Sequence, residues 1–328
     1  MCIRDRIPIT LTVQDSSSNT ASCSSWITVL DTISPVASCN PTITAYLNTA
    51  GIVSINPSQI DNGSSDNCGT PTLSLDQSSF DCTHLGTPQS VILTASDGSN
   101  SSTCASSVVV TDTISPTLAC TNHTAYLDAT GQYTVTQGDV VISSGDNCGS
   151  PNILLSQTDF DCTHMGTNPI TVTARDASNN EVSCISTITV ADTIGPIVIC
   201  RNITAYINAS GTATISPADI DNGSSDNCGT PTLSIDINSF DCSDVNTIVD
   251  VTLTAIDGWG NGRSCVAEVT VLDTISPSVI CQDATVYLDA TGSVNITPGH
   301  VDAGSFDNCS SALNLSLDMN SFSCSELG

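Results

Sequence analysis

Acidic residues recur at three fixed places along the chain, and each place could supply a ligand to a metal ion. The first set opens a repeated Asp-Thr-Ile-Ser-Pro phrase, the second lies in a polar turn, and the third precedes an Asn-Cys pair. The sets are Asp31, Asp112, Asp192 and Asp273; Asp15, Asp97, Asp176 and Asp257; and Asp66, Asp146, Asp226 and Asp307. Ca2+ binds about six to eight carboxylate, amide and carbonyl oxygens, so we expect structural calcium at one or more sets. The alternative is that Asp and Asn only form turns here.

Cysteines are the second group of residues with chemical potential, and the chain has 17 of them. No two lie within four residues of each other, whereas zinc sites use closely spaced pairs, so disulfides are favoured over zinc. Disulfides persist in oxidising compartments, which predicts a secreted, extracellular or cell-surface protein. No signal peptide is visible, and we therefore expect that the natural N-terminus is missing.

The Asp-Thr-Ile-Ser-Pro phrase recurs every 80 or 81 residues, with glycine in place of serine at Gly195. A period of this length predicts an array of small domains. We expect complete repeats at residues 31–111, 112–191 and 192–272. Residues 7–30 match only the end of a repeat and residues 273–328 only its beginning, so they are predicted to be two parts of a split repeat. Residues 1–6 match nothing in the repeats and are interpreted as an extraneous leader.

The elements that would position these side chains are short strands. In the first repeat, β-branched and alternating segments predict strands at residues 42–47, 52–55, 73–75, 91–95 and 107–111. The first two are joined by a turn that ends at Gly51, where a left-handed residue is needed. About six or seven short strands in each repeat predict an all-β fold, a tandem array of Ig-like β-sandwich domains. Domains this small bury little apolar area, and disulfide staples would compensate for it.

Several motifs follow one another in a fixed order within each repeat. In the first, these are residues 31–35 with Cys39, then 66–69, then 95–100, then Cys104 and a Val-rich strand. This order resembles the hyalin-repeat type of Ig-like domain and related tandem repeats of bacterial surface proteins, over residues 7–328. The resemblance implies an extracellular adhesive, stalk or filament role without enzymatic activity, and calcium at the junctions between domains. One departure is that serine replaces the usual glycine before the last-turn asparagine in two repeats.

Four cysteines in a complete repeat allow three connectivities. In an Ig-like sandwich the first and last strands run parallel from one pole, which favours pairing of the first cysteine with the fourth and leaves the second with the third. A linker Asp and a last-turn Asp would meet at the same pole. The predicted bridges are Cys39–Cys104, Cys68–Cys82, Cys120–Cys184, Cys148–Cys162, Cys200–Cys265, Cys228–Cys242 and Cys309–Cys324, with Cys281 joined to Cys23 of the next unit.

The split repeat bears on the expected partners. Cys23 occupies the fourth cysteine position, which residues 273–328 lack, so the end of one unit and the start of the next would complete a domain. Two interpretations stay open: a window on a longer continuous array, or separate chains that join head to tail by donating strands. Identical repeats or neighbouring chains are the expected partners in both, and such contacts generate an open filament.

The charge balance excludes several other partners. The chain has 33 acidic and 5 basic residues, a formal net charge of −28, and no lysine, so nucleic acid is not an expected ligand.

No apolar stretch approaches the roughly 20 residues that a membrane helix needs, and no membrane span is predicted. Apolar residues make up 39% of the chain, which together with the regular β-branched runs favours folded domains over disorder.

Exposed turns of an extracellular array are also candidate sites for glycans. The Asp-Thr-Ile phrase resembles a bacterial O-glycosylation tripeptide, and several Asn-x-Ser/Thr sequons accompany it. The candidate acceptors are Thr32, Thr113, Thr193, Thr274, Asn62, Asn122, Asn202 and Asn222.

No pattern in the sequence points to catalysis. His84 and His164 are equivalent, but they lack an accompanying nucleophile pattern, and no phosphate loop or nucleophile elbow is present. We therefore expect a structural segment of an extracellular filament or stalk, without enzymatic activity. The alternative is an adhesin that binds carbohydrate or protein through its repeats. Exposed aromatics would support that alternative, and Trp26 and Trp259 are the candidates.

Overall fold

The computed structural model describes residues 6–326 of the chain. Contacts divide it into two compact units, and the division falls inside the second repeat. The first unit holds residues up to 123, 135–158 and 168–188, and the second holds 124–134, 159–167 and the residues from 189 onward. Residues 1–5 of the predicted leader lie outside the described residues, whereas Arg6 is the first residue of β1.

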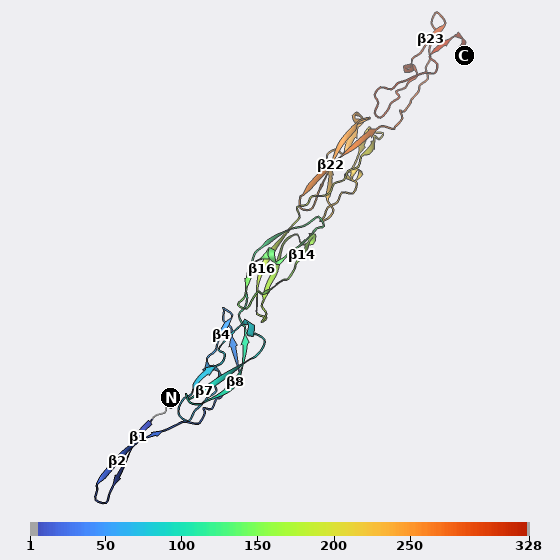
Figure 1. Cartoon of the computed structure of the whole chain (residues 1–328). Coiled ribbons are helices and arrows are strands. Elements are labelled where there is room, and N and C mark those ends of the chain that lie inside the picture. The colour runs from blue at the N-terminus through green and yellow to red at the C-terminus, as the bar shows by residue number, and fades with distance from the viewer. Residues whose placement is uncertain (1–5, 327–328) are drawn as a thin grey trace. The chain divides into compact units, whose positions relative to one another are not determined.

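The first repeat contains a four-stranded sheet with the strand order β3–β8–β7–β5 (Figure 1). These strands are β3 (Thr42–Tyr46), β5 (Thr72–Leu75), β7 (Gln89–Ser96) and β8 (Ser101–Thr111). β3 runs parallel to β8, while β7 is antiparallel to both β8 and β5. Alternate residues of β7 are buried, so one face of the sheet covers the core and the other meets solvent.

Shorter elements form the opposite layer of this repeat. β4 (Ile52–Ser54) pairs with β6 (Ser79–Asp81), and single bridges join Val36 to Ser65 and Cys39 to Asp61. Two helical turns complete the layer: α1 (Pro57–Ile60) and the 3-10 turn η1 (Cys82–His84). The buried side chains of Ile60 and Phe80 close the core against the sheet.

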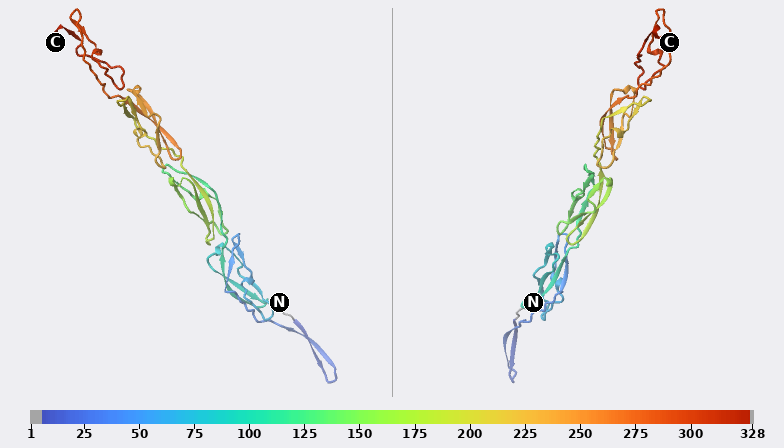
Figure 2. Two further views of the ribbon diagram at one scale, coloured as in Figure 1. Left: turned by 180° about the vertical axis from the view of Figure 1, so that it is seen from behind. Right: turned by 90° about the vertical axis from the view of Figure 1, so that its right-hand side faces the viewer.

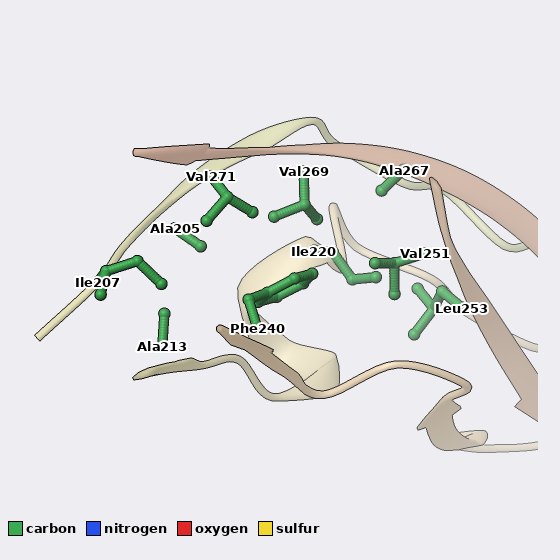
Figure 3. Packing of buried hydrophobic residues seen from close by; sticks show 10 residues of the cluster. All are labelled: Ala205, Ile207, Ala213, Ile220, Phe240, Val251, Leu253, Ala267, Val269 and Val271. Carbon is green, nitrogen blue, oxygen red and sulfur yellow. The ribbon is translucent and has the colours of Figure 1, made fainter. Parts of the chain in front are cut away.

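The third repeat has the same architecture. Its main sheet has the order β17–β22–β21–β19, and β21 and β22 run side by side in both views of Figure 2. The strands are β17 (Ile203–Tyr206), β18 (Thr212–Thr214), β19 (Thr232–Ile235), β20 (Ser239–Asp241), β21 (Ile248–Ile256) and β22 (Gly262–Leu272), with turns α3 (Pro217–Ile220) and η3 (Cys242–Asp244). Figure 3 shows Phe240 and Ile220 pointing into one interior with Val269 and Val271 of β22.

The second repeat contributes strands to both units. In the first unit β9 (Thr117–Cys120) pairs with β12 (Val141–Gly145), and β13 (Asn152–Leu155) pairs with β15 (Gly166–Arg175). In the second unit β11 (Gln132–Thr134) pairs with β14 (Asp159–Asp161). The remaining elements are β10 (His123–Tyr126), β16 (Glu181–Ala191), α2 (Gln137–Val140) and η2 (Cys162–His164).

The terminal segments contain fewer strands. At the N-terminal end, β1 (Arg6–Gln14) and β2 (Thr20–Thr28) form a hairpin whose residues are all exposed. At the C-terminal end, β23 (Ser293–Asn295) pairs with β24 (Ser321–Ser323), accompanied by η4 (Pro298–His300) and η5 (Cys324–Glu326).

The predicted fold class is confirmed: the chain is an all-β, disulfide-containing tandem array of Ig-like β-sandwich repeats. The predicted strands of the first repeat match β3, β4, β5, β7 and part of β8. The helical turns α1 and η1 were not predicted, because a segment of three or four residues shows no helical periodicity. The exact domain boundaries, including the split repeat, stay predictions.

Candidate metal centres at the repeat junctions

Three clusters of aspartates form in the part of the chain that the structure describes, and each takes one residue from each predicted set. The clusters are Asp31, Asp66 and Asp97; Asp112, Asp146 and Asp176; and Asp192, Asp226 and Asp257. Within a cluster, one carboxylate oxygen from each residue lies within 4.8 Å of the others. The first two clusters belong to the first unit and the third belongs to the second unit.

The linker Asp of each cluster is held by one carboxylate oxygen. Asp112 Oδ1 accepts hydrogen bonds from the backbone N–H of Ile114 (3.1 Å) and from Asn147 Nδ2 (3.1 Å). Asp192 Oδ1 accepts the equivalent bonds from Ile194 and Asn227. The linker phrase therefore bends around its own carboxylate, and the second carboxylate oxygen, Oδ2, is left buried without a donor among the described residues.

The Asp of the Asp-Asn-Cys tripeptide is fixed in the same way. Asp146 Oδ2 accepts a hydrogen bond from the backbone N–H of Cys148 (2.9 Å), and Asp226 Oδ2 accepts one from Cys228 (2.9 Å). This side-chain-to-backbone contact is an Asx turn, which explains why Asp stands two residues before the cysteine. Asp146 Oδ1 is left buried without a donor among the described residues.

The last-turn Asp joins the turn to the linker through an asparagine. Asp257 Oδ1 accepts from the backbone N–H of Trp259 and Asn261, and Asn261 Nδ2 donates to both Asp257 Oδ2 (2.7 Å) and the backbone oxygen of Asp192 (3.1 Å). Asn180 and Asn100 make the equivalent contacts with the oxygens of Asp112 and Asp31. These asparagines were not singled out as site residues from the sequence.

Two of the last-turn carboxylates that belong to the three clusters have a lowered pKa. Hydrogen bonds from the backbone N–H groups of Asn100 and Ser99 hold the pKa of Asp97 below its ordinary value. Burial acts to raise the pKa of Asp257, but hydrogen bonds from Asn261 and Trp259 outweigh it, and the net pKa is lowered. Both groups are therefore ionised at neutral pH.

Each complete repeat has one left-handed residue in its last turn, which lies one residue after the Asp in the first repeat and three residues after it in the second and third. Gly98 (φ 95°), Asn179 (φ 71°) and Gly260 (φ 92°) adopt this conformation. Asn tolerates this conformation better than other non-glycine residues. The missing glycine in two repeats therefore does not alter the contact between the turn and the linker.

Each cluster also contains buried carboxylate oxygens for which the described structure offers no hydrogen-bond donor. They are Asp31 Oδ2, Asp66 Oδ1, Asp112 Oδ2, Asp146 Oδ1, Asp192 Oδ2 and Asp226 Oδ1. Asp112 and Asp192 are only 4% and 6% exposed. A buried carboxylate without a partner is costly, and several converging carboxylates are more so. A cation is the chemistry that such an arrangement accommodates.

The remaining predicted metal residues do not join a cluster of three within the described residues. Asp15 lies in the exposed turn between β1 and β2, where its Oδ1 accepts from the backbone N–H of Ser17 and Asn19. Asp273 accepts a hydrogen bond from Asn308 Nδ2, next to Asp307, but no last-turn carboxylate accompanies this pair.

The first predicted type of disulfide is present within each complete repeat. The structure joins Cys39 to Cys104, Cys120 to Cys184 and Cys200 to Cys265, with Cα–Cα distances of 5.8, 6.2 and 6.0 Å. The parallel arrangement of β3 and β8 supports the expectation that the first and last strands share a pole.

The second predicted type of disulfide is wrong. Instead of Cys68–Cys82, Cys148–Cys162, Cys228–Cys242 and Cys309–Cys324, the structure joins the third cysteine of one repeat to the second cysteine of the next. The bonds are Cys82–Cys148, Cys162–Cys228 and Cys242–Cys309, with Cα–Cα distances of 5.4, 5.3 and 5.1 Å.

The reason for this error is the position of the two cysteines in the sandwich. Cys68 follows Asp66 and thus lies near the linker that enters the repeat, whereas Cys82 begins η1 beside Asn147 of the following repeat. The short sequence separation between Cys68 and Cys82 hid the fact that they lie at opposite ends of the domain. The predicted Cys281 bridge to Cys23 of a next unit stays a prediction. Both cysteines are exposed and form no bridge among the described residues, and the same is true of Cys324.

The hairpin turn at residues 48–51 is the surface that receives the next repeat. A Cβ on Gly51, whose φ is +71°, would lie 2.5 Å from the backbone oxygen of Asn147 and 2.8 Å from Cys82 Sγ. Gly131 has the same relation to Asn227 and Cys162. The glycine predicted from turn geometry alone is therefore also needed for the close approach of the next repeat.

The predicted glycan acceptors are all exposed. Two of the asparagines are engaged by neighbouring groups: Asn202 Nδ2 donates to Glu268 (3.0 Å), and Asn122 Oδ1 accepts from the backbone N–H of Thr187 (2.9 Å).

His84 has structural contacts, since its ring packs edge-on against Phe80 and lies 2.9 Å from Asp81 Oδ1.

A scan against protein-family models and a search of curated proteins each gave no match. Solved structures with similarity include titin domains I67–I69 (TM-score 0.36, 12% identity, 74% of this chain and 99% of that chain). Immunoglobulin domains 1–5 of Sidekick-1 give a TM-score of 0.33 at 8% identity, over 82% and 67% of the two chains. Protocadherin gammaB7 EC3–6 gives 0.31 at 15% identity, over 77% of each. At these scores the alignments carry no inference about function.

No helix within residues 6–326 combines the length and the apolar character needed to cross a membrane.

Proposed function

We propose that this chain is a structural segment of an extracellular filament or stalk, built from Ig-like repeats whose junctions are fixed by disulfides and calcium. The observation that carries the proposal is the set of three disulfides that each join one repeat to the next. A covalent bridge between neighbouring domains restricts their relative motion, which suits a load-bearing array. An oxidising location is required for such bridges to persist.

Calcium is the proposed ion at the three aspartate clusters. Each cluster provides three carboxylates, and oxygen ligands of this kind are the ones that a hard cation prefers. Thiolate and imidazole groups, which would favour zinc, are not part of any of the three clusters. An open hollow lined by Leu85, Gly86 and Ala177 lies beside Asp112 and offers a route for the ion.

Calorimetric titration of the chelator-treated protein with CaCl2 tests this proposal. We expect saturable binding, and a rise in unfolding temperature because a ligand that binds only the folded state stabilises it. Asp192→Asn should lower the number of bound ions, whereas Asp250→Asn, an exposed residue of β21 with the same change in charge, should leave it unchanged. Absence of binding by the unmodified chain would remove calcium from the proposal.

The finer parts of the proposal rest on the sequence. They are the hyalin-repeat relationship, a bacterial surface origin, glycans on the linker threonines such as Thr113, and head-to-tail continuation with identical repeats. Mass spectrometry of native material would test the glycans. A mass of each linker peptide that equals its unmodified sequence would exclude them.

A second candidate function is adhesion, and one observation favours it. Tyr46, Tyr126 and Tyr206 occupy equivalent positions at the ends of β3, β10 and β17 and are 59%, 57% and 58% exposed. Exposed rings can stack on sugars or on partner side chains. Binding to a glycan or protein array that is lost in the triple Tyr→Ala variant would favour the adhesin, and no binding by the parent chain would favour the stalk.

A further inference from the structure

The tripeptide Asp146-Asn147-Cys148 carries three different contacts in three consecutive residues. Asp146 belongs to the second aspartate cluster, and Cys148 is bonded to Cys82 of the preceding repeat. Asn147 lies between them and contacts both sides. Asp226-Asn227-Cys228 repeats this arrangement at the next junction, with Cys228 bonded to Cys162.

Asn147 connects the cluster to the preceding repeat through one amide group. Its Nδ2 donates to Asp112 Oδ1 (3.1 Å) within the cluster and to the backbone oxygen of Asn48 (3.3 Å) in the preceding hairpin turn. Asn227 makes the same pair of contacts with Asp192 Oδ1 (3.3 Å) and the backbone oxygen of Asp128 (3.1 Å). The same amide therefore orients a candidate ligand and clamps the neighbouring domain.

The amide oxygen of the same side chain is buried and accepts no hydrogen bond in the described structure. Asn147 Oδ1 and Asn227 Oδ1 recur in that state at equivalent positions, alongside the carboxylate oxygens of their clusters. An amide oxygen is a ligand that Ca2+ accepts. A bound ion would thus give a partner to the amide oxygen of this asparagine as well as to the carboxylate oxygens.

The preceding repeat fixes where the tripeptide lies. Cys148 packs against the apolar core of the first repeat as well as bonding to Cys82. The backbone of Asn147 rests directly on Gly51. Without the disulfide, the tripeptide would be held only by hydrogen bonds and by packing.

We propose that the inter-repeat disulfide and the cation site are energetically coupled: the preceding repeat completes the site by holding Asp146 and Asn147 in the binding position. This inference rests on the proposed calcium function. At each such junction, the intact disulfide then raises the affinity of the aspartate cluster for the cation. By thermodynamic reciprocity, the bound cation stabilises the bridge by the same factor.

The test isolates the second cluster in a background with Asp31→Asn and Asp192→Asn, and measures CaCl2 binding by calorimetry. Removing the junction bridge with Cys82→Ser and Cys148→Ser should weaken binding by about tenfold, within the usual range of coupling between sites. The matched control is Cys120→Ser with Cys184→Ser, which removes a disulfide of the same repeat that lies outside the tripeptide. We expect its affinity to change by less than about twofold.

Equal weakening in both variants, or none in either, would overturn the coupling. Failure of the background protein itself to bind calcium would instead reject the proposed calcium function. A reciprocal measurement covers the case in which a variant folds poorly. In the same background, with all cysteines in place, dithiothreitol reduces Cys82–Cys148 to two thiols, and alkylation followed by mass spectrometry gives the reduced fraction at equilibrium. Calcium should lower the reduction equilibrium constant of this bond by the same factor of about ten and leave that of Cys120–Cys184 unchanged.

Discussion

At the scale of single residues, the junctions depend on positions where the chain tolerates no side chain. Gly51 and Gly63 both have positive φ, 71° and 85°, but only Gly51 faces the next repeat, since a Cβ on Gly63 would meet nothing within 4 Å. The left-handed conformation alone costs an alanine about 1–2 kcal/mol. Gly51→Ala must also displace the backbone of Asn147, so we expect it to destabilise the junction more than Gly63→Ala does.

Hydrogen exchange read out by mass spectrometry distinguishes these two glycine variants. Gly51→Ala should accelerate exchange at residues 145–149 of the following repeat, while Gly63→Ala should affect only its own loop. Equal exchange at residues 145–149 in both variants would show that the contact between Gly51 and Asn147 contributes little.

The equivalent turn of the second repeat gives a prediction about pH. Hydrogen bonds from the Thr130 hydroxyl and from the backbone N–H of Gln132 and Thr130 lower the pKa of Asp128. A carboxyl group with a depressed folded-state pKa stabilises the fold above its unfolded pKa of about 3.9, and this stabilisation is lost as the pH falls through the folded value. Asp128→Asn should remove that loss, because Asn48 and Asn208 hold the same turn in the neighbouring repeats without titrating.

The measurement is amide exchange of residues 128–132 between about pH 4 and pH 2, corrected for intrinsic rates. The parent turn should lose protection toward the acid end, and the Asp128→Asn turn should keep it. Identical pH profiles would mean that the Asp128 carboxylate does not support the turn.

The residue types of the sequence predicted the aspartates of the candidate site, but they did not predict which cysteines pair beside it. The three sets of aspartates were visible from their period, because metal-binding residue types recur at fixed spacing. The pairing of Cys82 with Cys148 could not be predicted, because it depends on which end of a sandwich each loop reaches. The contacts of Asn147 and the exposure of the tyrosines were not predicted, although an asparagine follows the cluster Asp at the same place in every repeat.

At the scale of elements, the short strand β6 depends on one side chain. Phe80 is its single fully buried residue, and His84 of η1 packs against its ring at 5.5 Å between centroids. Phe80→Ala should cost about 3–5 kcal/mol in the first repeat. Ile52→Ala, in the paired strand β4 but 49% exposed, should cost much less.

Because η1 begins at Cys82, loss of Phe80 should also loosen the element that carries the junction disulfide. Hydrogen exchange of β4 and β6, measured at increasing guanidinium concentrations, would give the local free energy of opening. Comparable losses in Phe80→Ala and Ile52→Ala would contradict the assignment of Phe80 as the anchor of this layer.

The strands themselves were predictable because alternation of apolar and polar residues has the same period as a half-buried strand. The parallel arrangement of the first strand, β3, and the last strand, β8, was predictable from the Ig-like fold class. The helical turns α1 and η1 did not, since their few residues contain no period to detect, although Gln59 accepts a capping hydrogen bond from the backbone N–H of Asn56 (2.8 Å).

At the scale of the whole molecule, the disulfides divide into two kinds with different consequences. The bridges within repeats close loops of 64 or 65 residues, and by loop entropy each stabilises its own domain by about 4 kcal/mol. The bridges between repeats span the linkers instead. Among the described residues, Cys82–Cys148 is the disulfide that crosses the linker at residues 112–116, so it should hold the first two repeats together if that linker is cut.

A protease recognition sequence inserted between Ile114 and Ser115 makes this a direct test of connectivity. After cleavage, thiol alkylation and denaturation, the two pieces should migrate as one species without reductant and as two species with it. The same insertion in a Cys82→Ser and Cys148→Ser background should give two pieces under both conditions. Separation of the parent pieces without reductant would restore the pairing of Cys68 with Cys82 and of Cys148 with Cys162, and it would leave the array without covalent junctions. Retention would mean that breaking the backbone at a linker does not break the array, which is the property that a load-bearing filament requires.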